Sequence, residues 1–469
     1  MTRKKSVLII CYNFPPIGGG GVPRPLKMAK YLGEFGWNVH ILTVDPTYHV
    51  TTDPTLLDQL PASVKIHRAK EVNLLPRPQV QAATSTATRS SAAGQVQGKP
   101  SLVSRLKQTV ISVLKKLKPH LLIPDDQILW YPRAVKLGRE IMKNEKIDVI
   151  FSTSGPVTNH LIGQALSQEF ASKWVIDFRD PWTQNMHRSG IAWRDRWEER
   201  MEAKVMKQAD AVTTVTATFA KNFRAKYGET IKRLELIYNG FDQADFDDLQ
   251  PLLTQEGKFH AVYAGILYQK RNPRLLLRAI KVLIDEGLVD RNDISFSFAG
   301  VFDYPGYSEN ADCVRELGLD DVVHVLGNLK HKDALGLMKG ADVLLLIGDV
   351  TPDAGAYIPG KLYEYMGIGN PVLALNMPGE ATDIIQQFDL GQVANPTDQA
   401  EMKQAYLKLY QAWKSTQGSP AEQNSATSIK ASFAERVRPY ERKEQARQLA
   451  LLMDELIGEQ KKQVTSTSY

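Results

Sequence analysis

Cysteine is scarce in this chain of 469 residues, where only Cys11 and Cys313 occur. Two cysteines exclude a disulfide framework and a cysteine-rich zinc cluster, and they are typical of a protein from a reducing compartment. No apolar run approaches the roughly 18 residues of a membrane-spanning helix. The apolar run from Val7 to Cys11 follows three basic residues like a signal peptide, but no small-residue cleavage site comes after it. We therefore expect a cytoplasmic globular protein whose first strand is this run.

Acidic residues are absent from residues 72–124, although the whole chain contains 52 of them. At that frequency about six would be expected in this stretch, so the asymmetry carries information. Residues 79–100 are rich in Ala, Ser, Thr, Gly and Gln without periodicity, which predicts a disordered loop. In residues 101–118 apolar side chains recur every three or four positions, which predicts an amphipathic helix with a basic face.

Elsewhere, short apolar runs alternate with amphipathic segments, which predicts βαβ units and parallel sheets covered by helices on both faces. The length suits two such α/β domains, and we expect them over residues 1–245 and 246–430. A charged closing helix within residues 431–469 should pack back toward the N-terminal domain. The predicted strands are residues 6–11, 38–43, 147–152, 173–177, 211–214, 235–238, 260–264, 294–299, 323–325, 343–347 and 371–374.

Four glycines, Gly18 to Gly21, follow the first predicted strand and open a helix. Backbone N–H groups of such a loop can approach an anion closely, and a helix N-terminus favours negative charge. Gly19 and Gly20 therefore either cradle a phosphate or sugar or form only a flexible turn. A dinucleotide-binding fingerprint is not indicated, because Pro23 replaces its third glycine and five extra residues intervene.

A second polar loop reads Asp177-Phe178-Arg179-Asp180-Pro181-Trp182 and follows a predicted strand. Open α/β sheets bind ligands at the carboxyl ends of their strands, so these charges can belong to a site. Alternatively, an Arg–Asp pair only holds the loop in place. His160, in the first turns of a predicted helix, is open to the same two interpretations.

In the C-terminal half, Gly265 ends a predicted strand, and Lys270 and Arg271 follow at the turn to a helix. Two cations there could neutralise a diphosphate or could simply be solvated. Further on, Pro359-Gly360-Lys361-Leu362-Tyr363-Glu364 begins another helix, with Pro359 suited to its first position. The Glu364 carboxylate could accept two hydrogen bonds from a ribose diol, or it could be an ordinary surface residue.

Taken in order, these segments resemble the retaining nucleotide-sugar glycosyltransferases of family 4. The likeness extends over nearly the whole chain outside residues 72–125 and includes Ser154-Gly155-Pro156, Asn239-Gly240-Phe241-Asp242 and Asn370-Pro371-Val372-Leu373. The loop at residues 177–182 points to a subgroup of polysaccharide-assembly enzymes. The resemblance implies the GT-B fold, in which two Rossmann-like parallel α/β domains face a central cleft.

The resemblance also implies roles in donor binding. Glu364 matches a glutamate that grips the donor ribose, and Arg271 falls where a lysine usually meets the diphosphate. Lys361 would add a second cation, beside Gly360 and Gly265.

For the N-terminal domain, the resemblance implies that Gly19 and Gly20 face the donor phosphates or the acceptor, and that Arg24 and Arg179 contact the acceptor. Two residues are candidates for the catalytic position: Asp180 and His160.

Two positions depart from the family pattern. Ala356 stands where a glutamate usually contacts the donor hexose, and Ile266 stands where an arginine often follows the strand-end glycine. A non-catalytic saccharide-binding or scaffold subunit is therefore an alternative to an enzyme, and a GT-B sugar-nucleotide 2-epimerase is another. Asp245-Phe246-Asp247 has the pattern that other glycosyltransferases use for a metal. We assign it to the linker and expect no metal and no cofactor.

The leading hypothesis is transfer of a hexosyl or N-acetylhexosaminyl group from a nucleotide-diphosphate sugar to a lipid-linked saccharide, in cell-surface polysaccharide synthesis. The predicted helix at 101–118 would then bind an anionic membrane surface, peripherally at its inner face, at about 1 kcal/mol per basic residue. Otherwise it packs on the domain with its basic face solvated. Nucleic-acid binding is not expected, because the basic residues lack interleaved aromatic residues.

Overall fold

The computed structural model describes residues 3–49, 52–72, 120–185, 188–252, 257–351, 354–416 and 433–466. The loop predicted at 79–100 and the helix predicted at 101–118 lie outside these residues. The chain forms two compact units. The first comprises Met1–Val215, Ala220–Leu236 and Ala446–Tyr469, and the second comprises Thr216–Phe219 and Ile237–Gln445. No helix among the described residues has the length and apolar character needed to cross a membrane.

The first unit is built on a seven-stranded parallel sheet in the order β3-β2-β1-β4-β5-β6-β7. Its strands are β1 (Lys5–Ile10), β2 (Trp37–Val44), β3 (Lys65–Ala69), β4 (Val149–Thr153), β5 (Lys173–Phe178), β6 (Ala211–Thr214) and β7 (Leu234–Leu236). The connecting helices include α1 (Pro23–Leu32), α3 (Tyr131–Asn144), α4 (Thr158–Phe170), α5 (Ala192–Gln208) and α6 (Ala217–Tyr227). The order reverses next to β1, which pairs with β2 on one side and with β4 on the other.

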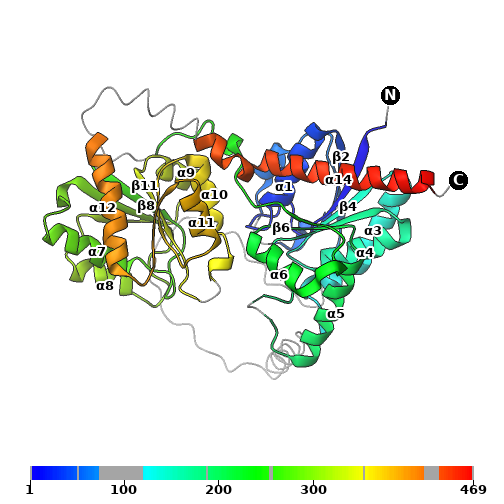
Figure 1. The fold of residues 1–469 in the computed structure, drawn as a ribbon, viewed down its shortest axis with the longest axis horizontal. Helices are drawn as coiled ribbons and strands as arrows, with labels where there is room; N and C mark the ends of the chain where they lie inside the picture. The colour runs from blue at the N-terminus through cyan, green and yellow to red at the C-terminus, as the bar shows by residue number, and fades with distance from the viewer. Residues whose placement is uncertain are drawn as a thin grey trace, which may run out of the picture. The chain divides into compact units, whose positions relative to one another are not determined.

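The second unit has a six-stranded parallel sheet in the order β10-β9-β8-β11-β12-β13. Its strands are β8 (Phe259–Ala264), β9 (Ile294–Ala299), β10 (Val323–Gly327), β11 (Val343–Ile347), β12 (Val372–Leu375) and β13 (Gly391–Ala394). Its helices are α7 (Arg274–Asp285), α8 (Glu309–Glu316), α9 (His331–Lys339), α10 (Gly360–Ile368), α11 (Glu380–Gln387) and α12 (Gln399–Thr416). Figure 1 shows α7, α8 and α12 on one side of this sheet and α9, α10 and α11 on the other.

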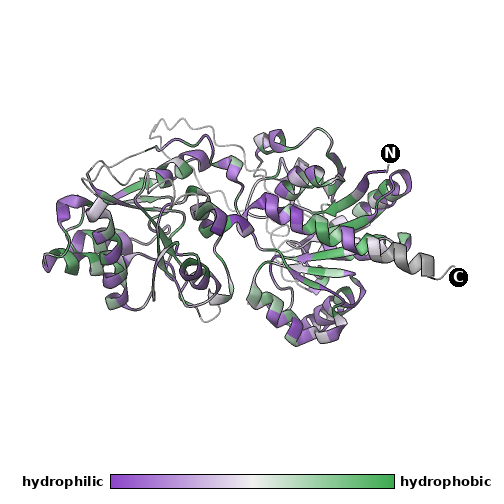
Figure 2. Ribbon diagram, turned by 45° about the horizontal axis from the view of Figure 1, so that its top comes forward, coloured by the Kyte–Doolittle hydropathy of each residue, from purple (hydrophilic) through white to green (hydrophobic). Residues whose placement is uncertain are grey.

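Both faces of the second sheet are buried, as a parallel sheet requires. Along β11, Val343, Leu345 and Ile347 join a core with residues of α7 and α12, whereas Leu344 and Leu346 join a core with residues of α9, α10 and α11. Successive side chains point to opposite faces, so an unbroken apolar run fills both cores. Figure 2 shows the strands as largely hydrophobic and the helices as mixed. The predicted fold class, two parallel α/β domains, is confirmed.

The closing helix was predicted as one continuous element, but the structure shows it interrupted. Residues 433–437 are helical, a 3₁₀ turn follows at Arg438–Tyr440, and α14 then runs over Arg442–Ser466. The interruption falls at Pro439, which lacks a backbone N–H and disfavours helical geometry in the residue before it. From Ala446 onward α14 belongs to the first unit, where Asp454 pairs with Lys5 of β1 at 2.5 Å.

Candidate functional site

The strongest candidate site lies at the carboxyl edge of the second sheet. Its order reverses at β8, which pairs with β9 on one side and β11 on the other. Open α/β sheets bind ligands at such a switch point. A cavity of about 300 Å³ opens there, lined by the residues that follow β8, β9 and β10, by the first part of α9 and by Glu364 of α10. The structure therefore brings Gly265 and Glu364, 99 residues apart in sequence, to one cavity.

Two of the residues that line this cavity are glycines, and each is in close contact with a neighbouring segment of the chain. Gly265 has a φ of +150°, and a Cβ there would overlap Nζ of Lys361. Gly300 has a φ of +106°, and a Cβ there would overlap the backbone oxygen of Gly265. Both residues adopt a conformation that favours glycine. The loops after β8 and β9 can therefore pack backbone against backbone.

The side chain of Lys361 lies next to Gly265, one of the residues that line the cavity. Its Nζ donates to the hydroxyl of Tyr263 over 2.8 Å and lies 4.1 Å from the centre of that ring. Burial and, to a lesser extent, the nearby Arg271 lower the pKa of Lys361 to about 8, although Glu364 and Asp349 oppose the shift. Burial also raises the pKa of Tyr263 to about 12. Lys361 is thus a cation near neutral pH that can lose its proton in mildly basic solution.

Glu364 is the acidic side chain that lines the cavity. Burial raises its pKa, and the positive charges of His331 and Lys361 act in the opposite direction. A half-buried carboxylate in this position can accept hydrogen bonds from the hydroxyl groups of a ligand.

Arg271 lies beside this site, at the turn between β8 and α7. Its Nε donates to Asp349 over 3.0 Å, and its guanidinium stacks on Tyr268, with 5.2 Å between the guanidinium carbon and the ring centre. The Tyr268 hydroxyl donates to the same carboxylate over 2.6 Å. Arg271 is therefore fixed by an acidic partner from the loop after β11.

The start of α10 differs slightly from its prediction. Pro359 is the residue before the helix, with an extended ψ of 134°, and Gly360 is the first helical residue. The prediction that Pro359 occupies the first helical position was wrong, since a residue that caps a helix keeps non-helical angles. Gly360 is exposed, and a Cβ there would meet nothing within 4 Å.

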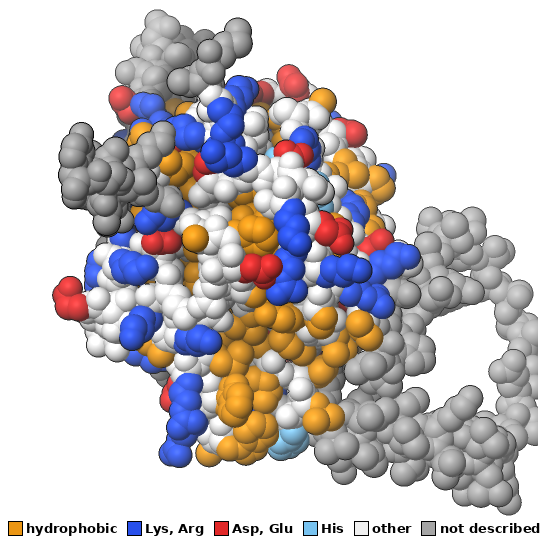
Figure 3. Space-filling view, turned by 90° about the vertical axis from the view of Figure 1, so that its right-hand side faces the viewer, with side chains coloured by type: hydrophobic (Ala, Val, Ile, Leu, Met, Phe, Trp, Pro, Cys, Tyr) orange, Lys and Arg blue, Asp and Glu red, His pale blue; other side chains and the backbone are white. Residues whose placement is uncertain are grey.

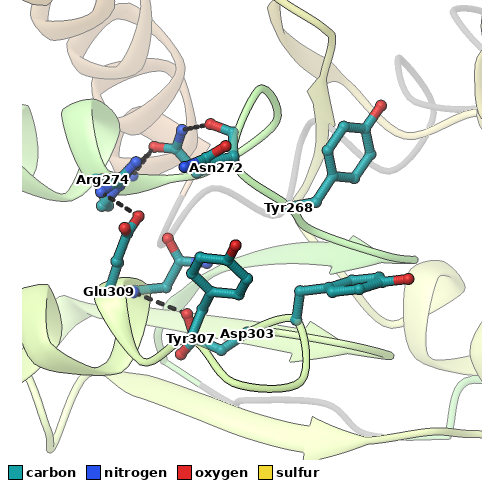
Figure 4. Close-up of a pocket in the computed structure, with 9 residues that line it drawn as sticks. Tyr268, Asn272, Arg274, Asp303, Tyr307 and Glu309 are labelled. Carbon is teal, nitrogen blue, oxygen red and sulfur yellow. Dashed lines mark hydrogen bonds and ion pairs between the residues drawn. The ribbon is translucent and has the colours of Figure 1, made fainter.

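A second cavity, of about 390 Å³, lies between the loops that follow β8 and β9 (Figure 4). Its lining includes three tyrosines, Tyr268, Tyr304 and Tyr307. Acidic and basic groups flank the rings: Glu309 pairs with Arg274 at 2.7 Å, and Asp303 accepts a hydrogen bond from the backbone of Asn310. Exposed aromatic faces beside polar groups can hold a sugar ring as well as other small ligands.

In the first unit, Arg24 and Asp177 form a fully buried pair. The Nε and Nη2 atoms of Arg24 donate to the two carboxylate oxygens over 2.9 and 2.8 Å, and the hydroxyls of Thr153 and Thr213 donate to the same carboxylate over 2.7 Å each. Burial alone would raise the pKa of Asp177, but Arg24 and these hydroxyls lower it overall. Arg24, 2% exposed, is therefore placed under the loops rather than on their surface.

Arg179 connects two of the predicted loops. Its Nη1 donates to the backbone oxygen of Gly21 over 2.7 Å, and its Nε donates to that of Ser154 over 2.6 Å. Gly155 has a φ of +81°, and a Cβ there would lie 2.7 Å from Nη2 of Arg179. The glycine loop after β1 and the loop after β4 are thus held together by one guanidinium.

His160 is completely buried in the first turn of α4. Its Nδ1 lies 2.9 Å from the hydroxyl of Ser152, which also accepts a hydrogen bond from Trp174. Among the described residues, Nε2 of His160 has no hydrogen-bond partner. Burial lowers the pKa of His160 to about 3, so the ring is neutral at physiological pH.

The remaining predicted residues of the first unit are at the surface. Asp180 is exposed after β5, and Gly19 and Gly20 are exposed in the loop after β1. Gly19 has a φ of +110°, and a Cβ at either glycine would meet nothing within 4 Å. Arg179 brings the loops that carry these residues together.

Some residues that shape these sites were not singled out from the sequence. Tyr263, Asp349 and His331 surround the predicted cations and Glu364 in the second unit. In the first unit, Asp125 accepts hydrogen bonds from the backbone and hydroxyl of Thr158, over 2.9 and 2.6 Å, at the start of α4. The sequence offers one usable signal, since Asp349 lies two residues after the end of β11 and directly follows Gly348.

No three His, Cys, Asp or Glu side chains in the described part of the chain are grouped so that they could hold a metal ion. Asp245 of the Asp245-Phe246-Asp247 string ends a short 3₁₀ turn, Gln243–Asp245, near the start of the second unit.

Comparison with known families agrees with this geometry. Residues 105–245 match the sequence model described as Glycosyltransferase Family 4, and residues 258–412 match the one described as Glycosyl transferases group 1. The chain therefore contains two glycosyltransferase family domains. A comparison of the sequence with curated proteins found no match.

Solved structures of glycosyltransferases share the fold over almost their whole length. Sucrose-phosphate synthase from Thermosynechococcus elongatus is 15% identical, with a TM-score of 0.57 over 97% of this chain and 100% of that one. A glycosyltransferase from Rickettsia africae is also 15% identical, with a TM-score of 0.58 over 97% and 99%. HepE from Anabaena, solved with UDP and glucose, is 15% identical, with a TM-score of 0.54 over 96% and 100%. The fold of the chain is GT-B.

Proposed function

We propose that this protein transfers a glycosyl group from a nucleotide-diphosphate sugar to an acceptor hydroxyl, and that the donor binds in the second unit. The observation that carries the proposal is the cavity at the carboxyl edge of the second sheet, where Gly265 and Glu364 meet beside Lys361. A carboxylate can bind the ribose hydroxyls of a nucleoside diphosphate, and a cation and nearby backbone N–H groups can bind its phosphates. HepE, which has the same fold, was solved with UDP and glucose.

In this proposal Glu364 accepts hydrogen bonds from the ribose hydroxyls, and Lys361 lies against the diphosphate. Arg271 contributes positive charge from the adjacent turn, although Asp349 already neutralises part of it. Gly265 and Gly300 let the backbone come close to the phosphates. No side chain caps the N-terminus of α10, and the N–H groups of its first residues add partial positive charge at this edge.

The reaction breaks the bond between the anomeric carbon and the diphosphate and forms a bond from that carbon to the acceptor oxygen. The diphosphate leaves with the bonding electrons, and its departing oxygen takes the proton that the acceptor hydroxyl loses. Fixed cations aimed at the departing charge stabilise this step. We propose that Lys361 and Arg271 supply this stabilisation without a metal ion, and that the anomeric configuration is retained.

The first unit would contribute the acceptor side. Arg179 holds the glycine loop against the loop after β4, so the exposed Gly19, Gly20 and Asp180 are carried on connected loops. We propose that Asp180 contacts the reacting groups. Arg24 and His160, both buried, would act by positioning these loops rather than by touching the acceptor.

We further propose that the acceptor is a lipid-linked saccharide and that the product enters a cell-surface polysaccharide, as the subgroup resemblance of the loop at 177–182 implies. The donor would be a hexosyl or N-acetylhexosaminyl nucleotide. The enzyme would work peripherally at the inner face of a membrane, with the basic segment at 101–118 as one point of attachment.

The test is turnover. The purified protein is incubated with a panel of nucleotide sugars and with lipid-linked acceptors, and release of the nucleoside diphosphate is measured. We expect release with one donor and one acceptor class, and a marked loss of release in Glu364→Gln. Donor binding without release would instead identify a saccharide-binding or scaffold subunit. Conversion of the donor to an isomeric nucleotide sugar would identify a 2-epimerase.

A further inference from the structure

Helix α5 of the first unit presents a face to solvent that combines tryptophan with basic residues. Its exposed positions recur at spacings of three or four, with Arg196 and Trp197 adjacent, which places them on one side of the helix. Apart from Ala192 at its first position, these positions are Trp193, Arg196, Trp197, Arg200, Lys204 and Lys207.

The two tryptophans are unusually open for their size. Trp193 is 50% exposed and Trp197 is 56% exposed. Leu121 is 68% exposed, and the neighbouring His120 stacks on Trp193 with 6.0 Å between ring centres. Figure 3 shows hydrophobic side chains gathered in the lower part of one face, where α5 lies in Figure 1, with a histidine at the lower edge and basic side chains alongside. Large exposed apolar side chains that cluster in this way mark an interaction surface.

The acidic residues of α5 lie outside this face and form hydrogen bonds or ion pairs there. Asp195 accepts from Ser189 over 2.8 Å, Glu198 pairs with Arg194 at 2.6 Å, and Glu199 pairs with Arg188 at 2.8 Å. The remaining acid, Glu202, is fully buried and pairs with Lys226 at 2.9 Å. Negative charge on this helix is therefore already neutralised by partners in the same unit.

The four cations of the exposed face differ in this respect. Within the described part of the chain, Arg196, Arg200, Lys204 and Lys207 form no ion pair. A surface that gathers unpaired cations around exposed tryptophan is complementary to an anionic partner with an apolar interior. A bilayer with anionic headgroups has this chemistry, because indole rings favour the headgroup level and long basic side chains reach the headgroups.

We propose that the exposed face of α5, together with His120 and Leu121, docks on an anionic lipid surface. This inference deepens the proposed function, because it names a surface that would bring a lipid-linked acceptor to the enzyme. It is separate from the basic segment at 101–118, since every residue in it belongs to α5 or to the two positions 120 and 121. The tryptophans enter the headgroup region, and the cations bind the lipid phosphates around them.

The experiment is flotation of the full chain with vesicles of phosphatidylcholine, with and without 30% phosphatidylglycerol. Because each basic residue near such a surface changes the partition coefficient about fivefold, Arg196→Gln with Arg200→Gln should lower it about 30-fold. Trp193→Ser with Trp197→Ser should lower it about tenfold or more. The matched control is Lys221→Gln with Arg224→Gln, which removes the same charge from exposed positions of α6 in the same unit and should leave binding nearly unchanged.

Several results would overturn the proposal. Unchanged flotation of both α5 variants would assign binding to another part of the chain. An equal loss in the α6 control would indicate general charge attraction, and equal binding to vesicles without phosphatidylglycerol would remove the role of the cations. A concentration-dependent dimer that the tryptophan variant abolishes, without vesicle binding by the wild type, would assign the face to self-association. Flotation needs no nucleotide, so failed turnover with intact flotation counts against the proposed function alone.

Discussion

The lowered pKa of Lys361 makes donor binding depend on pH in a defined direction. Burial lowers this pKa to about 8, and a lysine loses its positive charge as the pH rises through its pKa. With that value, about 90% of the molecules carry the charge at pH 7 and about 10% at pH 9. The terminal phosphate of a nucleoside diphosphate, with a pKa of about 6, is already about 90% ionised at pH 7 and gains little further charge up to pH 9. Affinity should therefore fall as the solution becomes more basic.

The expected loss is about tenfold between pH 7 and pH 9 if only the charged lysine contacts the diphosphate, since the fraction of competent protein falls by that factor. Isothermal titration calorimetry with UDP, GDP and ADP at half-unit intervals measures it. Tyr263, the hydrogen-bond partner of Lys361, has a pKa of about 12 and does not titrate in this interval. The protein's fold should persist over the same range, which circular dichroism checks.

Two variants make the assignment specific. Lys361→Arg keeps a positive charge throughout and should flatten the pH dependence. Lys361→Met should bind weakly at every pH, also without a slope. A wild-type dissociation constant that does not change from pH 7 to pH 9, or a slope that persists in Lys361→Met, would refute the placement of Lys361 against the diphosphate.

Three further predictions follow from the same contacts. Glu364→Ala should weaken nucleoside diphosphate binding by about 1–3 kcal/mol, because ribose hydroxyls would lose a buried acceptor; unchanged affinity in calorimetry would remove Glu364 from the site. Gly300→Ala should reduce binding and stability together, because its Cβ would overlap the backbone oxygen of Gly265; Gly360→Ala, at a position with open space, is the matched control and should unfold like the wild type in urea. Asp177→Asn should lower the free energy of unfolding by about 3–5 kcal/mol, because it leaves Arg24 buried without a counter-charge; a urea midpoint within error of the wild type would contradict this.

The sequence predicts the interior of the fold better than its edges. The strands at 294–299 and 343–347 were predicted with the observed bounds of β9 and β11. Both are buried on both faces: β11 is an unbroken apolar run, and β9 alternates apolar residues with Ser295 and Ser297. The edge strands β3 and β13 were not predicted. Their residues, Lys65–Ala69 and Gly391–Ala394, are mostly half-exposed, so neither segment shows an apolar run. These segments are strands because they pair with β2 and β12, and their own sequences do not indicate this pairing.

The same limit applies to the candidate site. Gly265 and Glu364 could be predicted to meet, because strand ends and helix starts of a parallel sheet share one edge. The fixation of Arg271 by Asp349 and the burial of Lys361 against Tyr263 could not be predicted, because they depend on packing between distant segments. For Asp177, one of the two interpretations of the sequence matches the structure. The sequence left open whether its loop binds a ligand or is held by an Arg–Asp pair, and the structure shows Asp177 paired with Arg24 below the surface.

Helix α14 determines which fragments of this protein contain a complete first unit. Leu449, Leu452, Met453 and Leu456 are buried, and they belong to a stretch that is part of the first unit although more than 200 residues separate it from Leu236. A fragment ending at residue 236 would lack these side chains and expose the apolar surface that they cover. If the chain is divided after residue 236, the N-terminal fragment lacks part of its own unit, and the C-terminal fragment carries a helix that belongs to the other unit. Co-expression of residues 1–236 with a peptide covering 446–466 would supply the absent helix.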